Sequence, residues 1–183
     1  MTVKFIINED GVLEKAYLAD DMGAAIEHGV RGKRIEDFDI SLLTSATIPN
    51  VVEYIGDDAF AGCDWLVNVD IPGSVTGIGD RAFSDCYSLE AVSIPASVTN
   101  IGDDLFVDCN NLESVTILGK ITGIGDRAFA WCESLKDIII TDSVTHIGDR
   151  AFYGCDKNLI IRTSAGSFAE RYAIEQGIIY ETF

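Results

Sequence analysis

Apolar side chains recur in this chain at intervals of 23 residues, beginning with Ile48. The repeated isoleucines are Ile48, Ile71, Ile94, Ile117 and Ile140. Seven residues after each of them, a further isoleucine precedes a Gly-Asp pair, and these pairs are Gly56-Asp57, Gly79-Asp80, Gly102-Asp103, Gly125-Asp126 and Gly148-Asp149. A fixed period of this length is the sequence signature of a repeat protein.

The rest of the repeat is equally regular. Each rung carries a phenylalanine followed three residues later by a cysteine, and the phenylalanines are Phe60, Phe83, Phe106, Phe129 and Phe152. A leucine and then a valine or isoleucine follow in most rungs, as at Leu66 and Val69. We expect a single domain over residues 1–183, with an N-terminal cap over 1–47, five repeats over 48–162 and a C-terminal cap over 163–183.

The pattern within one rung predicts its local structure. The segment from Leu66 to Ile71 alternates apolar and polar positions near its end, as a half-buried strand does. A second, shorter extended piece is expected just before each Gly-Asp pair, with the glycine supplying a tight turn or a positive φ. The aspartate is placed to cap a short helical turn, for example from Asp80 to Cys86. Stacked rungs would then share one core and one parallel sheet.

The two ends of the chain depart from the repeat and are expected to cover the open rungs. Two apolar segments, 3–7 and 12–17, flank a turn-forming stretch and predict a hairpin. A short helix is expected over 20–28, and 38–43 resembles a degenerate first half-rung. At the other end we expect a helix over 167–176, stopped by Gly177, and a closing strand over 178–180.

The pattern I-P-x-x-V-x-x-I-G-x-x-A-F-x-x-C-x-x-L-x-x-V closely resembles the BspA-like bacterial leucine-rich-repeat family over residues 48–155. Residues 166–173 are similar to that family's C-terminal cap. Local departures are Leu105 at the alanine position, and Leu118 and Thr141 at the proline position. The resemblance implies an α/β repeat solenoid, a right-handed leucine-rich-repeat coil with a parallel sheet on one face. It also implies a bacterial surface or secreted protein that binds host matrix proteins, other bacteria or glycans.

The charge balance narrows the possible partners. The chain has 30 Asp and Glu against 13 Lys and Arg, a formal net charge of −17. Such a surface repels phosphate backbones and anionic lipids, so we expect no nucleic-acid partner and favour a basic protein or a glycan. No apolar run approaches the ~18 residues of a membrane span, and residues 1–10 do not resemble an export signal. The compartment stays open.

Candidate chemistry is sparse. The five cysteines fall one per rung and lack metal-ligand spacing, so we expect buried free thiols rather than disulfides or zinc. The two histidines, His28 and His146, have no nucleophile placed beside them by a known signature. We therefore predict no catalytic residue, no cofactor and no metal site, with calcium binding left open.

The variable positions that flank the inward residues of the predicted strands are the best candidates for partner binding. They are Asn68, Asp70, Glu90, Ser93, Glu113, Ser114, Thr116, Lys136 and Asp137. The exposed face of a stacked sheet is the usual recognition surface of curved solenoids. Trp65 and Tyr87, on adjacent rungs, either anchor a partner or pack against the next rung.

These observations leave three functional hypotheses in order. The first is a non-enzymatic protein-binding scaffold of the bacterial surface type. The second is a carbohydrate-binding module, favoured by the aromatic pair. A column of threonines at Thr76, Thr99, Thr122 and Thr145 is expected to form a structural hydroxyl ladder, and the same array would also suit an ordered ligand such as a glycan. The third is an intracellular interaction module. The oligomeric state and the role of the first 37 residues remain open.

Overall fold

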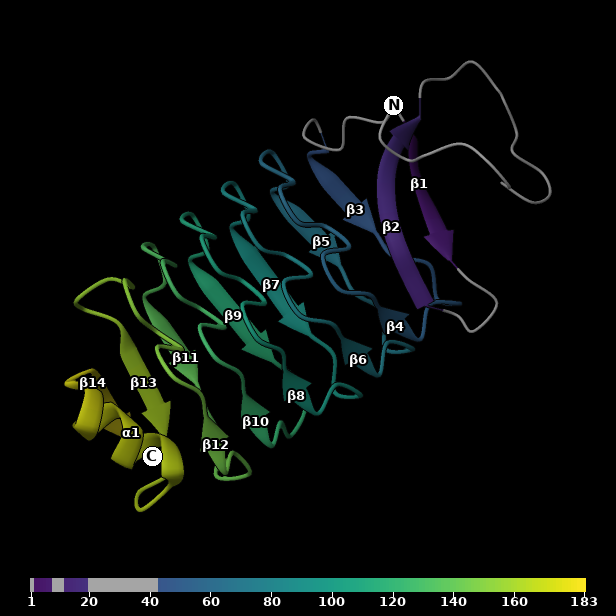
Figure 1. Cartoon of the computed structure of the whole chain (residues 1–183). Helices are drawn as coiled ribbons and strands as arrows, with labels where there is room; N and C mark the ends of the chain where they lie inside the picture. The colour runs from purple at the N-terminus through teal and green to yellow at the C-terminus, as the bar shows by residue number, and fades with distance from the viewer. Residues whose placement is uncertain (1, 8–11, 20–42) are drawn as a thin grey trace.

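The computed structural model describes residues 2–7, 12–19 and 43–183 and shows a stack of similar rungs (Figure 1). Each rung contributes one strand to a seven-stranded sheet with the order β14-β13-β11-β9-β7-β5-β3, in which the assigned pairings are parallel. The strands are β3 (Ser45–Thr47), β5 (Asn68–Asp70), β7 (Ala91–Ile94), β9 (Ser114–Ile117), β11 (Asp137–Ile139), β13 (Ile160–Thr163) and β14 (Ile179–Thr182). The repeat solenoid expected from the sequence is confirmed.

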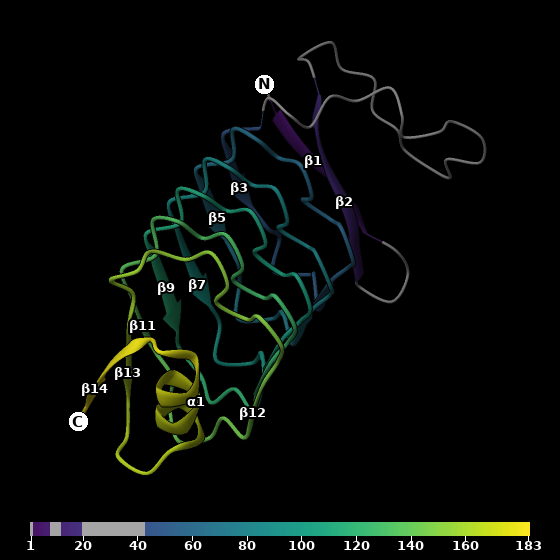
Figure 2. The ribbon, with the colours of Figure 1, turned by 60° about the vertical axis from the view of Figure 1, so that its left-hand side comes forward.

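A second set of two-residue strands lies on another side of the coil, as the end-on view shows (Figure 2). These strands are β4 (Tyr54–Ile55), β6 (Gly77–Ile78), β8 (Asn100–Ile101), β10 (Gly123–Ile124) and β12 (His146–Ile147). They pair in parallel and in register in two sheets, with β4 beside β6 in one and β8, β10 and β12 in the other, so that Ile101, Ile124 and Ile147 stand side by side. The shorter extended piece predicted in each rung is therefore present.

The core is built from the repeated apolar positions. The five phenylalanine rings form a continuous stack, with centroids 5.0–5.6 Å apart and neighbouring planes within 14°. Phe60, Phe83, Phe106 and Phe129 are fully buried. Because each ring stacks on the rings of adjacent rungs, the core runs along the coil, and each rung depends on its neighbours for burial.

The cysteines form a second column beside this stack. They are free, and four of the five are buried, which agrees with the sequence prediction. Each thiol from Cys86 onward donates to a phenylalanine carbonyl of the preceding rung, as Cys109 Sγ does to Phe83 O at 3.1 Å. These thiols thus find hydrogen-bond acceptors inside the core, where an unpaired polar group would be costly.

The segment after each Gly-Asp pair differs from the prediction. It is a series of turns rather than a helical turn, and the residue two places after the glycine has a positive φ, as at Arg81 (55°) and Asp104 (53°). The glycine itself does not have one. A Cβ on Gly125 would lie 2.7 Å from the backbone nitrogen of Asp103, so glycine is needed because adjacent rungs approach closely.

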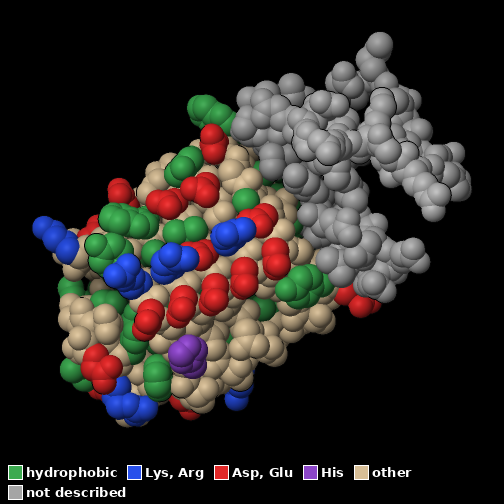
Figure 3. Space-filling model, viewed as in Figure 1, with side chains coloured by type: hydrophobic (Ala, Val, Ile, Leu, Met, Phe, Trp, Pro, Cys, Tyr) green, Lys and Arg blue, Asp and Glu red, His purple; other side chains and the backbone are tan. Residues whose placement is uncertain are grey.

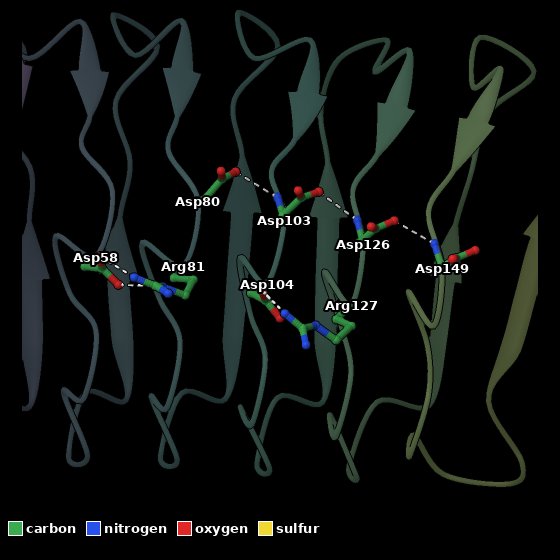
Figure 4. A network of polar contacts seen from close by, with 8 residues as sticks. All are labelled: Asp58, Asp80, Arg81, Asp103, Asp104, Asp126, Arg127 and Asp149. Carbon is green, nitrogen blue, oxygen red and sulfur yellow. Dashed lines mark hydrogen bonds and ion pairs between the residues drawn. The ribbon is translucent and has the colours of Figure 1, made fainter.

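The predicted capping role of the aspartate is also wrong. Asp80 Oδ1 accepts the backbone N–H of Asp103 in the next rung at 2.9 Å, and Asp103 and Asp126 repeat the contact toward the following rungs. These bonds run along the coil rather than within one turn (Figure 4). The carboxylates therefore join successive rungs, whereas a helix cap would have joined residues of the same rung.

The N-terminal hairpin is confirmed. Strand β1 (Thr2–Ile7) pairs antiparallel with β2 (Val12–Ala19), and β2 pairs in parallel with β4 of the first rung. The hairpin thereby extends the short-strand sheet at its N-terminal end and covers an otherwise open strand edge. The helix expected over 20–28 and most of the half-rung expected over 38–43 lie outside the described residues.

The C-terminal cap agrees with the sequence. Helix α1 (Phe168–Gln176) begins after Ser167, whose side chain accepts the N–H of Glu170, and ends at Gly177 with a φ of 68°. Strand β14 then closes the large sheet beside β13. One detail was not expected: Asn158, at the leucine position, is exposed, and Leu159 is buried in its place. The leucine of the last rung is displaced by one position, while Ile161 keeps the 23-residue spacing and pairs with Ile138.

Candidate functional site

The nine sheet positions selected from the sequence all lie on the exposed face of the seven-stranded sheet or immediately before one of its strands. Their neighbours on the chain point inward, as Val69, Val92, Val115 and Ile138 do. The strand register places Ser93 beside Thr116, and Ser114 beside Asp137. The structure therefore brings these side chains together in rows across successive rungs, with neighbouring strands ~4.8 Å apart.

The charges on this face are distributed unevenly. Toward the C-terminal end, Lys136 Nζ lies 3.0 Å from Glu113 Oε2, and Arg162 contacts both Asp137 (3.4 Å) and Glu181 (2.6 Å). Toward the N-terminal end, Asp70 and Glu90 form no ion pair with any residue that the structure describes. Among the described residues, the acids of the face without an ion pair thus include Asp70 on β5 and Glu90 immediately before β7.

The aromatic pair suggested by the sequence is exposed. Trp65 is 59% and Tyr87 is 43% exposed, and the Tyr87 hydroxyl donates to Asp85 Oδ1 at 3.2 Å. The threonine column has a different role, because the hydroxyls of Thr76, Thr122 and Thr145 donate to carbonyls of the preceding rung. The threonine hydroxyls therefore serve the stacking of the rungs, as their regular spacing suggested.

A second charged surface, which sequence reasoning missed, lies along the turns that follow the Gly-Asp pairs. Figure 3 shows a row of acidic side chains beside a row of basic ones on this face. In the basic row, Arg81 pairs with Asp58 (2.8 Å) and Arg127 with Asp104 (2.6 Å) (Figure 4). The hydrogen bond to Asp58 raises the pKa of Arg81. From Asp58 to Arg127, aspartate and arginine thus alternate along the coil and pair between adjacent rungs, and the next rung carries a further arginine, Arg150.

Beside this row lies a shallow groove of about 440 Å³ whose lining includes the arginines of three rungs. At one end, the rings of Trp131 and Tyr153 meet edge to face at 5.2 Å, and the Arg150 guanidinium lies 5.7 Å from the Tyr153 centroid. The available sequence signal was the tryptophan at the repeat position that holds Asp85 and Asp108 in the two preceding rungs.

The described residues offer little for catalysis. Within them, no group of three or more His, Cys, Asp or Glu side chains is arranged to hold a metal ion. His146 is exposed on β12, whereas His28 lies outside the described part. Burial raises the pKa of the Cys155 thiol to about 12 and that of Cys132 well above its ordinary value, so these thiols stay protonated and unreactive near neutral pH.

One carboxyl group that lines the groove, that of Asp108, has a raised pKa. Burial, together with the negative charges of Asp85 and Glu133, raises the pKa of Asp108. Its carboxyl group is therefore a weaker acid than an isolated aspartate, though the shift does not make it a catalytic group. The arrangement as a whole supports binding through rows of exposed side chains.

Comparison with solved structures finds bacterial leucine-rich-repeat proteins. A leucine rich cell surface protein from Faecalibacterium prausnitzii A2-165 is 28% identical, with a TM-score of 0.61 over 88% of this chain and 52% of its own. The T. pallidum leucine-rich-repeat protein is 31% identical, with a TM-score of 0.62 over 66% and 58%. The pneumococcal vaccine antigen PcpA is 26% identical, with a TM-score of 0.61 over 67% and 31%.

This chain thus spans 31–58% of the length of these proteins. No curated protein matches it. Among the helices in the described ranges, none is long and apolar enough to cross a membrane. The family model for the BspA type leucine rich repeat region matches residues 35–159 in six copies, so the first half-rung counts as a repeat beside the five expected. On this match the chain belongs to the BspA type leucine-rich-repeat family.

Proposed function

We propose that this protein is a non-enzymatic interaction scaffold that binds a basic protein partner through the exposed face of its seven-stranded sheet. The observation that carries the proposal is the exposed sheet face at β5 and β7, where Asp70 on β5 and Glu90 immediately before β7 have no cationic partner among the described residues. Membership of a leucine-rich-repeat family supports it, because such solenoids present extended surfaces to other proteins.

The two ends of the proposed surface differ in how many of their acidic side chains form ion pairs. Glu113 and Asp137 already have Lys136 and Arg162 beside them, so a partner gains less by contacting these acids. A cationic side chain that approaches Glu90 or Asp70 meets a carboxylate that forms no ion pair within the described part of the chain. We infer that the partner's basic patch faces the half of the sheet nearer β3, where electrostatic complementarity favours orientation and rapid association.

We also propose that the protein acts at the bacterial cell surface. The support is the likeness to the leucine rich cell surface protein from Faecalibacterium prausnitzii A2-165, of which the chain covers 52%. Fractionation of the source cells, followed by protease treatment of intact cells, tests this location. Recovery of the protein with the cytosol, and protection from protease, would reject the surface proposal and favour the intracellular module.

The binding proposal is tested with three charge reversals, Glu90→Lys, Glu113→Lys and Glu175→Lys. Glu175 is exposed on α1, away from the sheet face, and provides a matched control because the net charge changes equally. Basic secreted proteins captured by the wild-type chain serve as ligands in surface plasmon resonance. We expect Glu90→Lys to raise Kd about tenfold, corresponding to about 1.4 kcal/mol, and Glu175→Lys to leave it within about twofold.

Glu113→Lys is expected to have an intermediate effect, because Lys136 already compensates the native carboxylate. If all three substitutions weaken binding equally, the attraction depends on net charge alone and the sheet is not the recognition surface. If Glu90→Lys has no effect while Glu175→Lys weakens binding, the partner binds elsewhere.

A further inference from the structure

The groove on the turn face has a composition unlike the rest of this acidic chain. Its charged lining consists of Arg81, Arg127 and Arg150 against Asp85, Asp104 and Asp108, three of each sign. The chain as a whole has 30 acidic and 13 basic residues. The groove is therefore a locally neutral place with both hydrogen-bond donors and acceptors, at the end of which two aromatic rings are exposed.

The position of Trp131 requires specific local structure. Its φ is 63°, in the left-handed region where a bulky residue is rare, and the same repeat position in other rungs carries Asp85, Asp108 or a glycine. The ring lies against Gly154 of the next rung, where a Cβ would be only 2.7 Å from Trp131 Cδ2. The repeat itself supplies this backbone conformation, which Asp85 (58°) and Asp108 (60°) share, and the glycine in the adjacent rung leaves room for the indole at the surface.

The neighbouring groups fix a small aromatic platform. The Tyr153 ring stands at 89° to the Trp131 ring, and the two rings remain 55% and 43% exposed. The backbone N–H of Trp131 donates to Tyr153 O at 2.7 Å, so the two residues are held together by the main chain as well. The platform is thus positioned by the fold before any ligand arrives, which lowers the entropic cost of binding.

The polar groups beside the platform are also positioned. Asp104, whose side chain is only 13% exposed, orients the Arg127 guanidinium through the 2.6 Å ion pair. Arg150 forms no ion pair with a residue in the described ranges, and its guanidinium lies over Tyr153. Arginines supply N–H donors along the groove, while the Asp85 and Asp108 carboxylates supply acceptors.

We propose that this groove binds a neutral saccharide, independently of the sheet face. A pyranose ring offers one apolar face of C–H groups, which fits an exposed indole or phenol ring, and a rim of hydroxyls that both donate and accept. An anionic ligand would meet three aspartates, and a cationic ligand would meet three arginines. A neutral polyhydroxylated ligand uses both kinds of group without an uncompensated charge, and this complementarity selects the class.

The test uses the tryptophan content of the chain, which has two tryptophans. In a Trp65→Phe background the indole of Trp131 is the sole fluorescence reporter, and Trp65 is outside the groove lining. The probes are cellotriose, maltotriose, mannotriose and triacetylchitotriose, titrated separately. We expect at least one to give a saturable change in emission, and the Kd to change less than about twofold between low and high salt, because a neutral ligand releases few counterions.

Two variants and one control then locate the site by saturation-transfer NMR with the probe that binds. Trp131→Asn removes the indole and introduces a residue that tolerates a positive φ, so the fold should be retained. Arg150→Gln removes a donor without changing the aromatic platform. Both should raise Kd about tenfold or more, whereas Trp65→Ala, which removes the other exposed tryptophan, should leave Kd unchanged.

Several results would overturn the proposal. They are the absence of binding by all four neutral probes, binding that survives both Trp131→Asn and Arg150→Gln, and binding only of an acidic polymer such as polygalacturonate. Thermal melting of each variant shows that loss of binding is not loss of fold. Because the sheet is not involved, Glu90→Lys should bind the saccharide as the wild type does.

Discussion

The phenylalanine stack allows a quantitative test of the packing. Phe106 lies in the central rung, is 0% exposed, and stacks on Phe83 at 5.6 Å and on Phe129 at 5.5 Å. Phe106→Ala would remove a buried ring from the middle of the column and leave a cavity between two rigid neighbours. The rungs on both sides are joined by backbone hydrogen bonds, so the cavity cannot close easily.

The size of the effect follows from these contacts. Truncation of a buried phenylalanine to alanine costs about 3–5 kcal/mol in comparable cores. Phe106→Leu retains most of the apolar volume and loses two ring contacts of ~0.5–1.5 kcal/mol each, so it should cost about 1–3 kcal/mol. At the end of the stack, Phe152 has one stacked neighbour and meets Tyr172 edge to face at 6.2 Å, so Phe152→Leu should cost less.

Urea unfolding followed by far-ultraviolet circular dichroism measures these differences. The slope of the unfolding free energy against urea should be unchanged in a variant that keeps the same rungs folded. A smaller slope would indicate that the stack unfolds in parts, which is a known behaviour of repeat arrays. A loss of less than about 1 kcal/mol for Phe106→Ala would refute the conclusion that the ring column holds adjacent rungs together.

Three further predictions concern the contacts between rungs and the C-terminal cap. Gly125→Ala should lower the melting temperature markedly, because the new Cβ would lie 2.7 Å from backbone atoms of Gly102 and Asp103. Gly73→Ala is the control and should be tolerated, because the space around Gly73 is open. Equal melting temperatures of the two variants would contradict this. Burial raises the pKa of the Cys155 thiol from an ordinary 9.0 to about 12, so the thiol ionises at lower pH in the unfolded chain than in the folded one. The stability that the buried neutral thiol contributes should therefore be complete below about pH 9 and lost as the pH rises to about 12. Urea titrations on both sides of this window check the sign, and the loss should be smaller in Cys155→Ala. Ser167→Ala should cost about 0.5–2 kcal/mol in urea unfolding because the N–H of Glu170 loses its acceptor, and an unchanged midpoint would show that the cap is not needed.

Much of the fold could be predicted because the repeat is regular and its 23-residue period can be read directly from the sequence. An apolar position every 23 residues specifies which side chains stack, and alternation around Val69 specifies which face of the strand is buried. The hairpin and the C-terminal helix were predictable from local signals such as turn residues and the flanking Ser167 and Gly177. These signals act within a few residues of one another, which is the range over which sequence patterns carry information.

The features that were not predicted arise between rungs. The role of the repeated glycine depends on the approach of the preceding rung, and the aspartate bonds a backbone N–H 23 residues away, as Asp80 does to Asp103. The local rules for turns and helix caps therefore predicted the wrong structural role for both the glycine and the aspartate. Leu159 is a similar case, since only the shape of the core shows which of two adjacent positions turns inward.

The candidate sheet surface was located from the sequence, but its electrostatics were not. All nine polar positions are exposed, yet only the pairing across rungs shows that Glu113 is compensated by Lys136 and that Glu90 has no such partner among the described residues. The groove beside Trp131 was missed for the same reason. Its parts come from four rungs, and no single repeat contains it.

The most direct test of the sheet as the recognition surface is a carboxyl-labelling footprint. The protein is treated with a carbodiimide and an amine, alone and in complex with a captured partner, and the extent of modification is measured at each acidic residue by mass spectrometry. The account predicts protection at Asp70 and Glu90, weaker protection at Glu113, and none at Asp126 or Asp149 on the turn face. Protection of the turn-face aspartates with unchanged labelling at Asp70 and Glu90 would contradict it.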